Sequence, residues 1–349
     1  MNKKKVYMLF AFLMAVIVMK AQQREGTYAF LNSTNSARVA ALGGTMIPIF
    51  DSDIQLDLFN PSLINKDIDN SVALSYVDYF RDINFATIQY GKSFEKLGNF
   101  VGTVQFHNYG KFYYADETGF VDGSLFSSSD YSINIGWGRS LNDRFNIGAN
   151  IKFLGVQYEN NSSFAIAVDV AGTFRTGSDW IVSLVARNIG RELYSNYTGV
   201  NNKMPFKMQI GASKKLEHLP LTFIMVYDNL QKWNLAYEDP LDLEGNYDPM
   251  TGEYKEKSEM DKFAKNLFSH FVFAGELNIG KNLVLRLGYN YGYRQTMKSP
   301  TKKGAVGLSY GVGIRVYKFH ISYSRSEKHL YGSPNYITIT TNLNSFKKH

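Results

Sequence analysis

Three consecutive runs between Ser129 and Phe174 alternate between apolar residues and small or polar ones, and this alternation limits the possible folds more than any other feature. The first run sets Tyr131, Ile133, Ile135 and Trp137 against Ser132, Asn134, Gly136 and Gly138. A period of two residues indicates β-strands with one apolar and one polar face. Each run has about the ~9–11 residues that a tilted strand needs to cross a bilayer.

The same alternation recurs along the chain and predicts fourteen strands from Ser71 onwards. Near the C-terminus, for example, Leu283, Leu285 and Leu287 alternate with Val284, Arg286 and Gly288. The strands are expected near residues 71–79, 83–93, 98–112, 129–139, 143–158, 162–176, 179–189, 203–215, 219–229, 267–279, 282–294, 303–316, 318–325 and 335–344.

The lengths of the connections carry separate information. Connections after even-numbered strands are short, as at Leu141-Asn142 and Gly280-Lys281, whereas those after odd-numbered strands are mostly long, as at residues 190–202 and 230–266. Transmembrane barrels have short turns at one end and long loops at the other, and a soluble sandwich has no reason to sort its loops in this way. The sequence therefore predicts an all-β fold, a transmembrane antiparallel β-barrel of about fourteen strands, with soluble all-β folds as the alternative.

A barrel also follows from the chemistry of the bilayer. In hydrocarbon every backbone N–H and C=O must be paired within the protein, and only a closed sheet leaves no unpaired edge. The apolar faces are then expected to contact lipid, and the small and polar faces to line the lumen. Fourteen strands enclose more space than wall side chains can fill, so a plug is expected.

The N-terminal part of the chain divides into two segments of different character. Residues 1–21 carry Lys3, Lys4 and Lys5 ahead of an apolar run from Val6 to Met19, which is typical of a signal peptide, with a buried helix as the alternative. Residues 22–70 read as a short helical hatch or plug, in which Ser36 can cap a helix that stops at Gly43-Gly44. Residues 71–349 are then the barrel.

Charge and composition exclude several classes of function. Removal of the signal peptide would lower the formal charge from +7 to +3, because this segment carries four lysines and no acid, so nothing calls for nucleic acid. There is no Cys and hence no thiol chemistry. No nucleotide-binding motif, metal-spaced histidines or Ser/His pair can be nominated, and the sequence indicates a protein that is not an enzyme and holds no cofactor.

Two groups of polar residues are candidates for function. Charged residues on the inward face could line a path for a solute, but a network of paired charges that holds the plug to the wall is the favoured interpretation. These lumen residues are Lys152, Asp169, Arg187, Glu276, Arg286 and Arg315. The long loops are the expected surface for a partner, and their candidate residues are Tyr194, Tyr197, Asp239, Asp242, Glu244, Tyr247, Asp248 and Tyr254.

The acidic loop 238–261 also raises the question of a bound ion. Asp242, Glu244, Asn246 and Asp248 alternate as calcium ligands can, which makes the three acidic residues a weak metal candidate. An EF-hand-type loop needs Gly at its sixth position, whereas Gly245 stands at the fourth. A solvated acidic loop or a docking surface is the favoured interpretation.

Several segments resemble the PorV and PorQ outer-membrane proteins of Bacteroidetes, which are distant relatives of the FadL transporters. Residues 35–44 are similar to the N-terminal signature that this superfamily shares. The pieces that point to PorQ are residues 60–65, 74–80, 108–112, 116–119 and 148–153. The resemblance covers essentially the whole chain after residue 21. One departure is that Phe346 is followed by Lys347, Lys348 and His349 instead of ending the chain.

The resemblance implies a fourteen-stranded barrel with a hatch in the outer membrane of a Gram-negative bacterium, in contact with outer-membrane lipid. It also implies a non-enzymatic role in the type IX protein secretion system. There the chain would anchor a PorZ-like surface protein, which recognises anionic lipopolysaccharide, in an attachment complex with sortase-like and PorV-like components. The alternative is a FadL-like transporter of hydrophobic small molecules.

Overall fold

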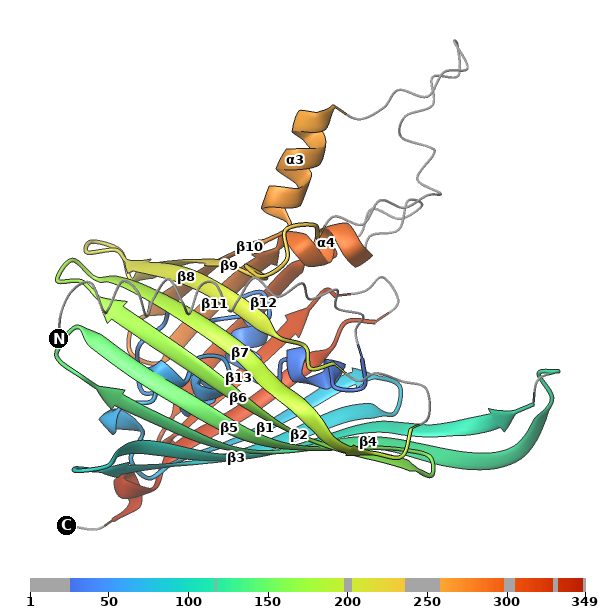
Figure 1. The fold of residues 1–349 in the computed structure, drawn as a ribbon. Helices are drawn as coiled ribbons and strands as arrows, with labels where there is room; N and C mark the ends of the chain where they lie inside the picture. Colours follow the sequence, from blue (N-terminus) through green and yellow to red (C-terminus); the bar gives the residue numbers. More distant parts are fainter. Residues whose placement is uncertain are drawn as a thin grey trace, which may run out of the picture.

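The chain forms one closed antiparallel barrel of fourteen strands, in which each strand pairs with its neighbour in sequence and β1 pairs with β14 (Figure 1). The computed structural model describes residues 26–116, 118–197, 203–235, 258–297, 305–328 and 332–347. The predicted fold class is therefore confirmed. The expected signal peptide, residues 1–21, lies outside the described residues.

The bounds of the elements are as follows. The strands are β1 Ser71–Phe80, β2 Ile83–Phe94, β3 Gly98–Ala115, β4 Val121–Ser140, β5 Phe145–Tyr158, β6 Asn161–Arg175, β7 Trp180–Ser195, β8 Lys207–Lys215, β9 Leu221–Tyr227, β10 Phe271–Ile279, β11 Leu283–Asn290, β12 Leu308–Val316, β13 Phe319–Ser326 and β14 Asn335–Asn342. The helices are η1 Ala29–Asn32, α2 Ala37–Ala41, η2 Ile54–Leu58, η3 Pro61–Leu63, η4 Lys66–Ile68, α3 Glu259–Phe268, α4 Tyr291–Met297 and η5 Leu343–Phe346. None of the helices in the described part of the chain is long and apolar enough to cross a membrane.

The wall has the two faces that the alternation predicts. Large apolar side chains such as Leu74, Ile88 and Ile133 are exposed on the outside, while their neighbours Ser75 and Thr87 are buried inside. We call the end that carries the connections after β2, β4 and β6 the turn end, and the opposite end, which carries α3 and α4, the loop end. The C-terminus lies at the turn end (Figure 1).

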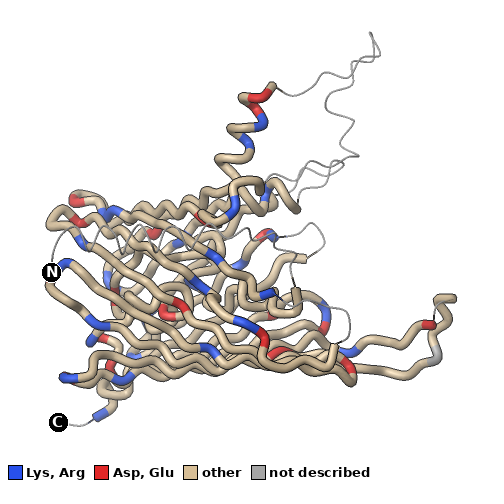
Figure 2. Tube along the Cα trace, viewed as in Figure 1, with Lys and Arg blue, Asp and Glu red and all other residues tan. Residues whose placement is uncertain are grey.

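Some predicted boundaries are wrong because bulges break the alternation. The loop expected at residues 111–128 is mostly strand, and the β3–β4 hairpin projects well beyond the barrel as a ribbon with few charged residues (Figures 1 and 2). Gly110, with a φ of 83°, shifts the pairing between Asn108 and Lys111 and so hides the period of two. The β5–β6 connection is also a short turn. Strand β11 ends at Asn290, because Asn290 accepts a hydrogen bond from the Tyr293 N–H at the start of α4.

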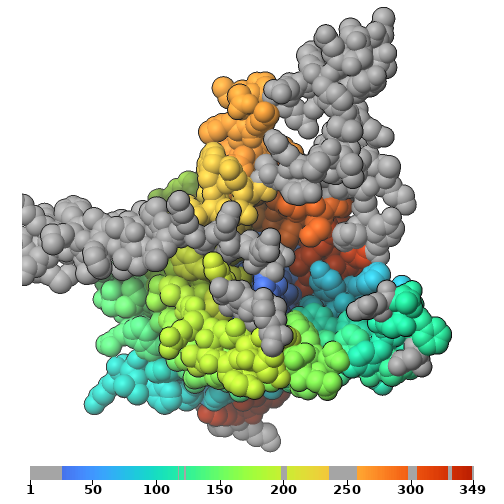
Figure 3. All heavy atoms as spheres, turned by 45° about the vertical axis from the view of Figure 1, so that its right-hand side comes forward, coloured from blue at the N-terminus to red at the C-terminus, as the bar shows by residue number. Residues whose placement is uncertain are grey.

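Residues 26–70, the hatch, fill the inside of the barrel and are visible in blue at the loop-end mouth (Figure 3). Ser36 caps α2 by accepting a hydrogen bond from the Val39 N–H, as predicted. Inward glycines of the wall make room for hatch backbone: a Cβ on Gly148 would lie 2.2 Å from the Pro61 carbonyl, and one on Gly288 would lie 2.3 Å from the Gly43 nitrogen. The hatch therefore packs directly on the inner wall.

Candidate functional site

A buried ionic network joins the hatch to the wall. Its centre is Arg38 of α2, whose guanidinium nitrogens lie 2.7 Å from Asp51 Oδ2, 3.1 Å from Asp53 Oδ2 and 2.9 Å from Glu276 Oε1. Glu276 of β10 also accepts a hydrogen bond from Arg286 Nε of β11 at 2.8 Å. We call these five residues the Arg38 network. Because Arg38, Glu276 and Arg286 are buried, each charge depends on its partners, and the network fastens the hatch to β10 and β11.

Sequence reasoning placed Glu276 and Arg286 in the lumen but missed Arg38, which anchors them. A signal was present: Arg38 is a lone cation among small apolar residues in a segment predicted to be buried in the lumen. A buried arginine needs a carboxylate partner.

The other predicted lumen residues lie in three places. Lys152 and Asp169 pair inside the barrel, Arg187 lies at the loop-end side of the hatch, and Arg315 lies at the turn end. Lys152 Nζ lies 2.7 Å from Asp169 Oδ2 and 2.9 Å from Asn188 Oδ1, so these residues join β5, β6 and β7 inside the barrel. Arg187 is buried next to the hatch. Arg315 lines a cavity at the turn end, and no ion pair involves it among the described residues.

Polar side chains of the wall bind the hatch from several sides. Asn35 donates to Thr87 of β2 at 3.0 Å, and Asn60 donates to Thr173 of β6 at 3.1 Å. Gln55 donates to Ser75 of β1 at 2.7 Å. Since buried polar groups need partners, the hatch satisfies much of the inner wall.

Several parts of the inner wall are apolar, among them Leu154 and Val156 of β5, and one such part lies along β7, β9 and β10. Val185 of β7, Ile224 and Val226 of β9 and Val272 of β10 face inward and form what we call the apolar wall patch. Hatch side chains cover the patch completely; they include Val39, Leu42, Met46, Ile47, Leu56 and Phe59. Burial of such side chains stabilises the packed hatch by about 1.5–3 kcal/mol each. A lumen-facing apolar surface thus lies directly beneath the hatch.

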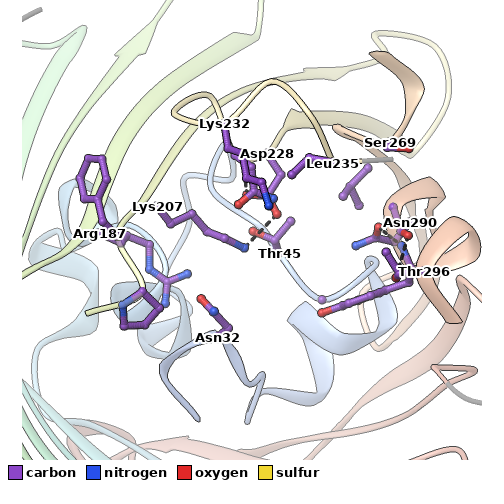
Figure 4. Close-up of a pocket in the computed structure, with 17 residues that line it drawn as sticks. Asn32, Thr45, Arg187, Lys207, Asp228, Lys232, Leu235, Ser269, Asn290 and Thr296 are labelled. Carbon is purple, nitrogen blue, oxygen red and sulfur yellow. Dashed lines mark hydrogen bonds and ion pairs between the residues drawn. The ribbon is translucent and has the colours of Figure 1, made fainter. Parts of the chain in front are cut away.

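Two cavities lie on opposite sides of the hatch. The loop-end cavity has a volume of about 310 Å³ and is lined by Gly44, Val272 and Asn290 among others (Figure 4). The turn-end cavity has a volume of about 450 Å³ and is lined by the Arg38 network and by Arg315 and His320.

The hatch lies between these cavities along β10 and β11. Val272 pairs with Asn290 in the loop-end cavity, and Glu276 pairs with Arg286 in the turn-end cavity. Gly288 lies between these pairs, against the backbone of Leu42 and Gly43. The segment around Gly43 therefore forms the barrier.

The predicted partner-binding residues are placed only in part. Tyr194, expected in a loop, lies in β7, because a bulge at Asn188, with a φ of 58°, extends the strand past the predicted end. Tyr197 donates a hydrogen bond to the Asn161 carbonyl at 3.2 Å. Outside the described residues lie Asp239, Asp242, Glu244, Tyr247, Asp248 and Tyr254. Within the described part, no group of His, Asp or Glu is arranged to hold a metal ion.

Comparison with solved structures finds the same fold in outer-membrane transporters. One crystal structure of the Pseudomonas putida toluene transporter TodX matches 89% of this chain and 99% of its own, with a TM-score of 0.51 at 9% identity. A second TodX structure matches 88% of this chain and 96% of its own, with a TM-score of 0.50 at 9% identity. A Pseudomonas aeruginosa FadL homologue matches 88% of this chain and 98% of its own, with a TM-score of 0.49 at 10% identity.

No family model and no curated protein matches the sequence. At about one residue in ten identical, the likeness to TodX concerns the fold, which is that of an outer-membrane barrel. The resemblance to PorQ proteins stays a prediction.

Proposed function

We propose that this chain is a non-enzymatic outer-membrane protein that passes small hydrophobic molecules, and that the hatch closes it in the state described here. The apolar wall patch carries the proposal: it faces the lumen, where polar residues are usual, and hatch side chains pack over it. The fold shared with a toluene transporter supports the same interpretation.

In this proposal, movement of the hatch has two effects. Withdrawal of Leu42 and Gly43 from Gly288 joins the two cavities along β10 and β11. The same movement uncovers the apolar wall patch as a contact surface for an apolar solute, which gains about 25 cal/mol for each Å² of apolar area removed from water. The Arg38 network opposes the movement.

The absence of cysteine makes the proposal testable with one engineered disulfide. The hydroxyl oxygens of Ser62 in the hatch and Thr173 in β6 are 2.7 Å apart, so sulfurs in their places lie within reach of a bond. The double variant Ser62→Cys/Thr173→Cys, in proteoliposomes, should take up an apolar fluorescent naphthylamine when reduced and lose uptake when oxidised.

Each single-cysteine variant is the matched control and should respond to neither treatment. Equal uptake by the oxidised and reduced double variant would show that uptake does not require η3 to leave β6.

A second candidate is the anchoring of a surface partner in a type IX secretion complex, and the projecting β3–β4 hairpin favours it. Phe112, Tyr113 and Leu125 are exposed there. The pairing of β3 with β2 ends at Asn108, and the pairing of β4 with β5 begins only at Ser128. Both edges of the projecting ribbon are therefore open. Open edges and exposed aromatic side chains are common protein-binding surfaces.

The two candidates differ in what removal of the ribbon does. Replacement of residues 113–125 by a two-residue turn should abolish co-purification of a PorZ-like partner in mild detergent and leave solute uptake intact. Deletion of residues 240–260 tests the acidic loop for the same role. Full retention of the partner by both deletions would exclude anchoring through these surfaces.

A further inference from the structure

We infer that the loop-end cavity binds a small hydroxylated anion, with the chemistry of a single hexose unit that carries a carboxylate or a phosphate. The first observation is an excess of positive charge. Among the described residues, Arg187, Lys207 and Lys232 line the cavity together with one carboxylate, Asp228 (Figure 4). This inference is independent of the passage of apolar solutes proposed above.

The carboxylate of Asp228 already has partners within the protein. Asp228 Oδ2 lies 2.9 Å from Lys207 Nζ, and Asp228 Oδ1 accepts hydrogen bonds from Gln209 Nε2 and the Asn229 N–H. Asp169, the other carboxylate close enough to act on Arg187, is paired with Lys152 at 2.7 Å. Among the described residues, Arg187 and Lys232 therefore have no carboxylate of their own.

Arg187 is held in place for an anion. Its side chain is only 5% exposed, lies over the Phe59 ring at 5.1 Å and donates one long hydrogen bond of 3.4 Å to the Leu31 carbonyl. Its Nε is buried and has no hydrogen-bond partner in the described structure. A buried guanidinium without a counter-charge is costly, and carboxylates and phosphates are the groups that it binds best.

Neutral polar groups around the cavity fit the hydroxyls of a sugar. Asn32 points toward the hollow beside Arg187, and its buried Oδ1 has no partner among the described residues (Figure 4). Asn229 and Thr296 add an amide and a hydroxyl, and Tyr293 adds an aromatic ring. The volume of 310 Å³ is at the lower end of the ~300–1,000 Å³ typical of small-molecule sites, so one sugar unit fits and an oligosaccharide does not.

The test is calorimetric titration of the full chain in detergent micelles with glucuronate, glucose 1-phosphate and uncharged glucose. Both anions should bind, with an affinity that falls as salt is added, and at least tenfold more tightly than glucose. Competition of bound glucuronate by purified lipopolysaccharide would identify a lipid-linked sugar as the source, and lack of competition a free solute. Equal binding of glucose and glucuronate, or no binding of either anion, would overturn the proposal.

Two variants locate the site. Lys232→Gln at the exposed rim should fold normally and weaken glucuronate binding about tenfold, the typical effect of losing one charge-assisted contact. Arg187→Gln should weaken it further, provided that the variant keeps the heat-modifiable mobility of a folded barrel. Lys214→Gln makes the same charge change at the turn end and should leave binding unaltered. Unchanged affinity in Lys232→Gln would place any bound anion elsewhere.

Discussion

At the scale of single residues, Arg38 contributes most to the closed state. Arg38→Gln leaves the Glu276 carboxylate with Arg286 alone and Asp51 and Asp53 without their cation. Loss of one partner from a buried ion pair costs about 3–5 kcal/mol. We expect faster hydrogen exchange of hatch amides and higher solute uptake, with the barrel intact on gels.

The control for Arg38 is Lys92→Gln, which removes a partly exposed pair with Asp69 and should cost below about 1 kcal/mol. A double variant Arg38→Gln/Glu276→Gln should lose less stability than the two single variants added together, because the residues act as one network. Strict additivity would show that Arg38 and Glu276 are not coupled.

Glycines that face the hatch are the second feature at this scale, and a glycine on the outer face of the wall provides a control. A Cβ at the inward Gly148 meets the Pro61 carbonyl at 2.2 Å, whereas one at Gly102, on the outward face of β3, meets nothing within 4 Å. Gly148→Ala should displace η3 and raise trypsin cleavage of the hatch, and Gly102→Ala should change neither. Equal protection of both variants in limited proteolysis would contradict the observed packing.

At the scale of elements, Asp69 ties together the start of β1, the end of β2 and η5 at the seam of the barrel. The Ser93 N–H and then Lys92 lower the pKa of Asp69 below its ordinary value. The folded state thus favours the ionised form, and its stabilisation is present above the unfolded pKa of ~3.9 and is lost as pH falls below it.

Urea unfolding in micelles measures this contribution. Asp69→Asn should be less stable than the parent chain at pH 6 by no more than about 1 kcal/mol, because the group is partly exposed, and this difference should shrink as the pH falls below the ordinary pKa of Asp. A stability difference that grew as the pH fell would show that ionised Asp69 does not stabilise the folded state.

The elements also show how far the sequence specifies this fold. Alternation specified the strand count and the inward side chains from Lys152 to Arg315, because one face meets lipid and the other the lumen. It failed at Gly110 and Asn188, where bulges shift the register without a distinctive residue pattern. It also could not show that Arg38 meets Glu276, since this contact joins segments 238 positions apart.

At the scale of the whole molecule, the hatch decides whether the lumen is open. In barrels that assemble without residues 26–70 the lumen should be continuous, because hatch side chains fill the space between the two cavities. In planar bilayers the deletion variant should show stable single-channel conductance, and the full chain should be silent or conduct only in brief events. A silent deletion variant that is still heat-modifiable would mean that the wall itself closes the lumen.

The close fit of the hatch has a consequence for biogenesis. Helix α2 packs against β11, β12, β13 and β14, whereas η3 packs against β4, β5 and β6, so the earliest part of the folded chain touches strands made throughout synthesis. We therefore expect the hatch to become enclosed as the sheet closes, when β14 pairs with β1 around it. Substitutions that remove contacts between hatch and wall should then lower the yield of assembled protein, in addition to loosening the hatch in the barrels that do assemble.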